Sequence, residues 1–98
     1  MMSTDIHRID DIIHGRLRLG IMAYLSTASP ASFPDLLNRT GATNGNLSTH
    51  LTKLETAGYI RQEKGYNGKR PQTLVHLTED GRTAWITYLD TMRVMLGL

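Results

Sequence analysis

The chain has 98 residues, no cysteine and a net charge of +2 at neutral pH. This length suits one domain with one hydrophobic core and leaves little room for an enclosed active-site cavity. The lack of cysteine excludes disulfides and thiolate metal sites, and no apolar run approaches the length of a membrane span. Because the N-terminus also lacks a signal-peptide pattern, we expect a single cytoplasmic domain over residues 1–98.

The charges are unevenly distributed along the chain. Residues 39–76 contain six Lys and Arg residues against two Glu residues, whereas the flanking segments contain five basic and seven acidic residues. A basic middle between acidic ends predicts a surface that meets an anion. Chance clustering on a solvated face would give the same distribution.

Apolar spacing in the first quarter of the chain predicts two helices. Residues 5–14 carry three isoleucines on one helical face, with Asp5 as the expected N-cap. A break is expected at Gly15. Residues 16–25 are apolar around most of the helical wheel, which is typical of a buried central helix, and a turn-rich segment follows over residues 26–32.

A helix-turn-helix is predicted over residues 34–57. Its first helix would begin at Pro34 and end near Thr40, with Gly41 as the C-terminal cap. Its second helix would be capped by Thr43 and run to residue 57, so that a turn of three or four residues containing Gly joins the two helices. The apolar stripe of this second helix consists of Leu47, Leu51 and Leu54.

The first two turns of that second helix are made of Asn, Gly, Ser and Thr, which are poor helix formers. Such residues either only cap the helix or face something that requires short hydrogen-bonding side chains. Two strand-like runs then follow over residues 59–77, and Asn67-Gly68 between them is a strong hairpin signal. Pro71 suits an edge or loop position.

A last helix is predicted from Thr78 to about residue 96, with acidic residues at its positive end. Its apolar residues cover roughly 200° of the helical wheel, about twice what packing against one small domain requires. The excess suggests a second subunit, although all of these residues could also pack inside one chain. The candidate dimer-interface residues are Ile6, Ile9, Trp85, Tyr88, Met92 and Met95.

The predicted fold is mainly α with a small β-hairpin, in the element order of a winged helix-turn-helix. The segments IHGRLRLGIMAYL (13–25), GNLSTHLTKLETAGYI (45–60), GKRPQT (68–73) and LTEDGR (77–82) resemble the small winged-helix transcriptional regulators related to MarR and ArsR. The resemblance covers nearly the whole chain. It implies a homodimeric prokaryotic regulator that binds double-stranded DNA, with helix 43–57 in the major groove and hairpin 59–77 as a wing.

This resemblance gives the polar helix start a role, because short side chains can reach base edges or phosphates without overfilling a groove. Asn46 is the best candidate for base readout, since an amide can bond adenine bidentately. Lys53 suits a phosphate, and wing residues 64–72 suit the flanking backbone or minor groove. The candidate DNA-binding residues are Thr43, Asn44, Asn46, Ser48, Thr49, Thr52, Lys53, Lys64, Asn67, Lys69 and Arg70.

Three further residues receive structural or uncertain roles. His50 flanks the leucine stripe, so a packing role is expected. Arg18 stands where such regulators commonly have Arg, and we expect it to hold the first helices against the wing domain. Arg61, like Lys64, is a weaker DNA candidate, because strand alternation places the two residues on opposite faces. A dimer would set two reading helices about one DNA turn, roughly 34 Å, apart on a near-palindromic operator.

Other function classes find little support. No P-loop, dinucleotide glycine pattern, nucleophile elbow or HExxH is present, so neither an enzyme nor a cofactor is expected. Asp10, Asp11 and His14 form only a weak metal-binding pattern. The alternatives are a winged helix that binds protein and an effector- or metal-responsive repressor. The sequence identifies no effector and no operator, and it does not distinguish a repressor from an activator.

Overall fold

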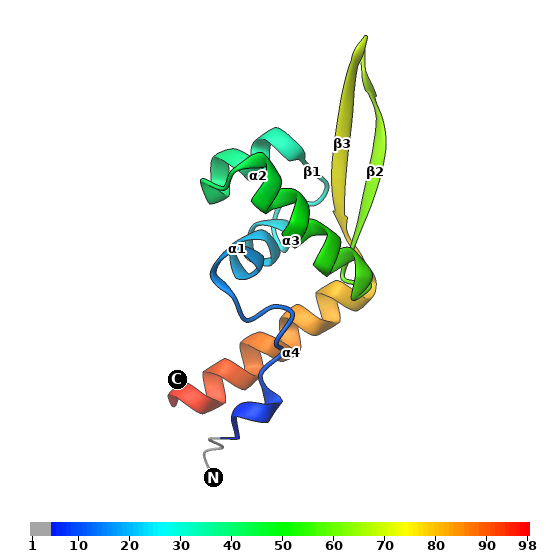
Figure 1. The fold of residues 1–98 in the computed structure, drawn as a ribbon. Helices are drawn as coiled ribbons and strands as arrows, with labels where there is room; N and C mark the ends of the chain where they lie inside the picture. The colour runs from blue at the N-terminus through cyan, green and yellow to red at the C-terminus, as the bar shows by residue number, and fades with distance from the viewer. Residues whose placement is uncertain (1–4) are drawn as a thin grey trace.

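A computed structural model describes residues 5–98 of the chain, which form four α-helices, a short 3-10 helix and one three-stranded antiparallel sheet (Figure 1). The elements are η1 (Ile6–Arg8), α1 (Arg16–Leu25), β1 (Ala31–Ser32), α2 (Phe33–Thr40), α3 (Asn44–Thr56), β2 (Ile60–Asn67), β3 (Arg70–Leu77) and α4 (Glu79–Leu96). The strand order is β1-β3-β2. Within this part of the chain, no helix is both long and apolar enough to cross a membrane.

The hydrophobic core lies among α1, α2, α3 and the base of the sheet. Its fully buried side chains are Ile13, Ile21, Met22, Leu25, Leu36, Leu47, Leu51, Leu54 and Val75. The three leucines of α3 are all in this set, as their spacing predicted. Each such burial stabilises the fold by about 1.5–3 kcal/mol relative to an exposed side chain, so α3 is firmly attached to the domain.

The predicted helix caps around the helix-turn-helix are confirmed. Gly41 has a left-handed backbone (φ 68°) and caps α2, and the Thr43 hydroxyl accepts a hydrogen bond from the Asn46 backbone N–H at 3.2 Å. The helix α2 begins one residue earlier than predicted, because Ser32 is its N-cap and accepts from the Asp35 N–H at 3.2 Å. Pro34 therefore occupies the second helical position.

The predicted helix over residues 5–14 is wrong. Only residues 6–8 are helical, and Asp5 caps this single turn by accepting from the His7 N–H at 3.0 Å. The Asp10 carboxylate then accepts from the Ile12 and Ile13 N–H groups at 2.8 and 3.3 Å. Such local side-chain bonds compete with the helical ladder and favour a turn, which explains why apolar spacing alone misled the prediction.

Strands β2 and β3 form a ribbon, here called the wing (residues 60–77), that projects well beyond the helices (Figure 1). The short strand β1 was not predicted, and it pairs with β3 only at Val75 and Leu74. Gly68 takes the first central position of the wing turn with φ 66°, and the flanking residues Asn67 and Arg70 pair directly. The strands thus extend to the turn on both sides, further than predicted.

Pro71 lies inside β3, opposite Tyr66. In a two-residue hairpin the pair that flanks the turn exchanges hydrogen bonds, so the next pair, Tyr66 and Pro71, is the non-hydrogen-bonded one. The Pro71 nitrogen consequently faces the edge of β3 that β1 does not reach, and its missing N–H removes no ladder bond.

Candidate nucleic-acid interface

All residues proposed from the sequence for DNA contact are exposed in the structure. Those on the α3 side are Thr43, Asn44, Asn46, Ser48, Thr49, Thr52 and Lys53, and those on the wing are Lys64, Asn67, Lys69 and Arg70. On α3 they lie away from the three buried leucines. The fold therefore gives α3 one apolar face in the core and one polar face in solvent.

The start of α3 combines a capped backbone with a free amide. The Thr43 side chain caps the helix, which is the structural alternative to DNA contact for this residue. Within residues 5–98, the Asn46 side chain makes no hydrogen bond, so its amide can bond a ligand. No atom lies within 4 Å of where a Cβ on Gly45 would be, so a ligand could approach the backbone closely there.

Two threonines of α3 have partly committed hydroxyls. The Thr49 hydroxyl donates to the Gly45 carbonyl and the Thr52 hydroxyl donates to the Ser48 carbonyl, each at 3.0 Å. Each oxygen can still accept a hydrogen bond. With the hydroxyl turned back to the helix, the methyl group of each side chain is available for an apolar contact, such as the methyl of thymine.

Arg18 fixes the middle of α3, although not in the way the sequence suggested. Its guanidinium donates to the Ile12 carbonyl at 2.5 Å and contacts His50 Nδ1 at 2.8 Å, so its partners are the N-terminal segment and α3 instead of the wing. Burial, followed by the charges of Arg18 and Lys53, lowers the pKa of His50. A neutral His50 accepts the Arg18 N–H through Nδ1, which confirms its packing role.

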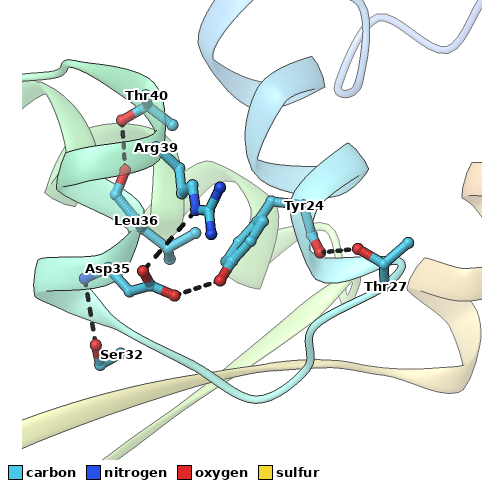
Figure 2. Close-up of polar contacts among 7 residues, drawn as sticks. All are labelled: Tyr24, Thr27, Ser32, Asp35, Leu36, Arg39 and Thr40. Atoms are coloured by element: carbon cyan, nitrogen blue, oxygen red, sulfur yellow. Dashed lines mark hydrogen bonds and ion pairs between the residues drawn. The ribbon is translucent and has the colours of Figure 1, made fainter.

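The first helix of the helix-turn-helix is tied to α1 by a polar cluster (Figure 2). The Tyr24 hydroxyl donates to the Asp35 carboxylate, and Arg39 Nε lies 4.0 Å from the same carboxylate. The Arg39 guanidinium also lies 4.8 Å from the centre of the Tyr24 ring. The hydrogen bond to Asp35, together with burial, raises the pKa of Tyr24. These contacts orient α2, against which α3 packs.

The two faces of the wing differ in charge. Paired residues and residues two apart on a strand share a face, so Lys64 lies on the face of the buried Val75, whereas Arg61 lies on the opposite face. That opposite face also carries Glu63, which bonds His76 at 3.0 Å. The separation of Lys64 from Arg61 by strand alternation is therefore confirmed.

The sequence did not single out Tyr66, whose side chain is 76% exposed next to the wing turn. An aromatic residue between basic ones in a predicted hairpin is the signal that could have identified it. It shares its face with Lys64. The wing thus presents a large apolar ring as well as positive charge.

The predicted dimer residues are only partly at the surface. Trp85 and Tyr88 are 8% and 4% exposed and stack with ring centres 5.8 Å apart inside the single chain, contrary to the expected partner contact. Ile9, Met92 and Met95 are half-buried, and Ile6 is exposed. The exposed apolar residues of α4 are instead Ile86, Leu89 and Leu96. Helical spacing could not show which half of the wide apolar arc packs inward.

The weak metal pattern near the N-terminus is used for structural contacts. Asp10 accepts a hydrogen bond from the Tyr59 hydroxyl at 2.5 Å, and His14 Nδ1 lies 2.9 Å from the Tyr88 hydroxyl. Burial and the Asp10 hydrogen bond raise the pKa of Tyr59 to about 12. In residues 5–98, no group of three or more His, Cys, Asp or Glu side chains is placed to hold a metal ion.

Comparison with known proteins agrees with this geometry. A family model described as "Winged helix DNA-binding domain" matches residues 17–96. An uncharacterized protein of Methanocaldococcus jannaschii, MJ0432, is 32% identical over 78 residues, which cover 80% of this chain and 85% of that protein. A transcriptional regulator homologue from Pyrococcus horikoshii OT3 is 28% identical and superimposes with a TM-score of 0.82, covering 95% of this chain and 88% of that one.

The wider structural neighbours include MarR-family and ArsR-family transcriptional regulators. A MarR-family regulator from Silicibacter pomeroyi has a TM-score of 0.69 at 22% identity, covering 87% of this chain and 56% of that one, and it supports the fold alone. The resemblance to these regulators is confirmed, and it relates the chain to DNA-binding proteins instead of enzymes. The chain belongs to the winged helix DNA-binding domain family.

Proposed function

We propose that the protein regulates transcription by binding double-stranded DNA as a homodimer. In this proposal, α3 lies in the major groove, where Asn46 reads a base, and Lys53 binds a phosphate. The wing residues 64–72 bind the flanking backbone or minor groove. The two α3 helices of the dimer would sit about one DNA turn, roughly 34 Å, apart on a near-palindromic operator.

The main support is that the two acidic side chains of residues 39–76 make hydrogen bonds or ion pairs with partners other than the basic residues proposed for DNA contact. The Glu55 carboxylate accepts from the Gln62 backbone N–H at 3.0 Å and from its side-chain amide at 3.1 Å, and Glu63 bonds His76. Within residues 5–98, no ion pair engages Lys53, Lys64, Lys69 or Arg70. Unpaired cations beside a solvated polar helix face are what phosphate binding requires.

A salt titration tests DNA binding. Fluorescence anisotropy of a labelled duplex would be followed from about 50 to 200 mM salt, with the wild type and with Lys69→Ala/Arg70→Ala. We expect wild-type affinity to fall steeply with salt, and the slope of log K against log salt to be smaller by about 2 in the double variant. Absence of binding at the lowest salt by a folded wild type would overturn the proposal.

The dimer proposal depends on an apolar stripe of α4 that the single chain leaves uncovered. Ile86, Leu89 and Leu96 are 60%, 48% and 62% exposed, and Ile6 of the adjoining N-terminal segment is 67% exposed. The helix has 18 residues, a length of about 27 Å, and its C-terminal half extends away from α1, α2 and α3 (Figure 1). A second copy of the same helix could cover this stripe.

Sedimentation velocity tests the dimer. The wild type should sediment as a dimer, and Leu89→Lys should shift it to a monomer because the charge would be buried in the interface. Thr87→Lys is the matched control, since Thr87 is exposed on the other side of the same helix. A wild type that remains monomeric at all concentrations would contradict the proposal.

A further inference from the structure

We propose that Tyr66 is a DNA-backbone contact of the wing: its ring packs on a deoxyribose and its hydroxyl binds a phosphate, next to a phosphate contact from Lys64. This inference rests on the proposed function and assigns a residue that neither the motif nor the charge pattern had selected.

The register places Tyr66 on the side of the wing that continues the core-facing surface of the sheet. Gln62 pairs with the buried Val75, Lys64 pairs with Thr73, and Tyr66 pairs with Pro71, all on one face. Pro71 and Thr73 also line an open groove between the wing and the start of α2. Asn67, Arg70 and Gln72 of the opposite face line the same groove, so the outer part of the wing brings both of its faces near the start of α2.

The Tyr66 ring is not required by the fold. It is 76% exposed, and within residues 5–98 no hydrogen bond or ring contact engages it. β1 ends its pairing at Leu74 and Val75, so no third strand lies beside Tyr66 and no core lies beneath it. Cross-strand packing against Pro71 is the remaining intramolecular use, and it leaves most of the ring accessible.

The Tyr66 face of the wing carries a cation and no acid, whereas the opposite face carries charges of both signs. The face of Tyr66 carries the Lys64 ammonium and the neutral side chains of Gln62 and Thr73. The opposite face carries Arg61 and, beside the turn, Arg70, together with the Glu63 carboxylate. A phosphate that approaches Lys64 meets no acid on the same face, whereas one that approaches Arg61 does.

Tyrosine suits such a contact because it combines a rigid apolar ring with a polar tip. Tyrosine hydroxyls are among the side-chain groups that bond phosphate oxygens, and such contacts position a protein on DNA without reading sequence. A lysine two residues away on the same face supplies the charge. The pair would therefore anchor the wing to one stretch of backbone.

Four single variants and the wild type, each checked for folding by circular dichroism, separate ring, hydroxyl and charge. With a random-sequence duplex at low salt, Tyr66→Ala should weaken binding by about tenfold and Tyr66→Phe by about threefold, the size expected for losing one hydrogen bond. Neither variant should change the salt slope, because no counterion-releasing charge is lost. Lys64→Ala should reduce the slope by about 1, and Arg61→Ala should leave it near the wild-type value.

A second measurement reports on the ring directly. Trp85 is the only tryptophan, so Tyr66→Trp in a Trp85→Phe background places a single fluorophore on the wing. Its emission should change when duplex DNA is added. Wild-type affinity in Tyr66→Ala, or emission that is constant while the duplex demonstrably binds, would overturn this inference and leave DNA binding intact. Absence of binding by the wild type would overturn both proposals.

Discussion

Helix α3 and the wing both present polar and basic residues to solvent, but they are held in place very differently. α3 buries three leucines completely, has a side-chain N-cap and is fixed at His50 by Arg18. Beyond Ile60 and Val75, the wing has no fully buried side chain and is a two-stranded ribbon next to solvent. Reading a base requires a fixed position of the hydrogen-bonding side chain, whereas a phosphate contact tolerates small shifts of the side chain.

This contrast suggests that α3 reads the base sequence and the wing binds the backbone. In both elements, the spacing of residues along the chain determines which side chains face the DNA. The helix uses its 3.6-residue period to separate an anchored face from a reading face. The wing uses its two-residue period to separate Lys64 and Tyr66 from Arg61 and Glu63.

Removing a buried leucine should cost far more stability than removing the exposed aromatic. Leu51→Ala should lower the free energy of unfolding by about 2–5 kcal/mol, because Leu51 is fully buried and a cavity would remain. Tyr66→Ala should change it by less than about 0.5 kcal/mol. Urea unfolding followed by far-UV circular dichroism measures both. Equal losses would show that the wing is as firmly packed as α3.

Gly45→Ala should separate stability from binding within α3. No atom lies within 4 Å of the added Cβ, so the helix should gain up to about 1 kcal/mol from the better helix former. DNA affinity should nevertheless fall, because the Cβ would keep the helix start away from the DNA backbone. Thermal melts and anisotropy on the same samples give the two values. A variant that is more stable and binds equally well would remove Gly45 from the interface.

Thr49 offers a matched pair of changes on the reading face. Because its hydroxyl donates to the Gly45 carbonyl, the methyl group is available for an apolar contact with a base, while the oxygen can only accept. Thr49→Ser should weaken operator binding by about 0.8 kcal/mol, the value of one buried methyl-sized group. Thr49→Val keeps the methyl and should bind more tightly than Thr49→Ser. The reverse order would assign the contact to the hydroxyl.

The attachment of α3 should also depend modestly on pH. The pKa of His50 is lowered in the folded chain, so the unfolded chain binds more protons once the pH falls below about 6.5. The His50 contribution is intact above that value and is lost as the pH falls from 6.5 through the lowered folded-state pKa. Melting temperatures at several pH values should show this loss.

The control for the pH prediction is His50→Asn, whose amide oxygen can accept from Arg18 near the position of Nδ1. This variant should lose less stability than the wild type over the same pH interval, because it has no group to protonate. An identical pH dependence in the two proteins would place the titration elsewhere.

Local signals predicted much of the fold. The leucine spacing of α3, the caps Thr43 and Gly41, and the hairpin turn at Gly68 depend on neighbours within a few residues, and each appears in the structure. With the three leucines inward, helical spacing also turns Asn46, Thr49, Thr52 and Lys53 outward, and all four are exposed in the structure. Helical and strand periods determine which side chains share a face before any tertiary contact forms.

The features that the sequence could not provide depend on distant partners. β1 consists of two residues and exists because β3 pairs with it. Arg18 was expected to hold the first helices against the wing domain, whereas its guanidinium contacts His50, which lies 32 positions away in the sequence. Trp85 and Tyr88 were expected at a dimer interface, since a helical wheel shows the width of an apolar arc without showing which part the chain covers itself.

A competition experiment tests whether α3 reads the base sequence while the wing binds the DNA backbone. An operator would be selected from a random pool of duplexes, and the ratio of operator to random-duplex affinity would be measured for the wild type, Asn46→Ala and Lys69→Ala/Arg70→Ala. We predict that Asn46→Ala reduces the preference for the operator by about 1–3 kcal/mol, whereas the wing variant weakens both affinities and keeps their ratio. Equal losses on both duplexes for Asn46→Ala, or a ratio lost only in the wing variant, would contradict it.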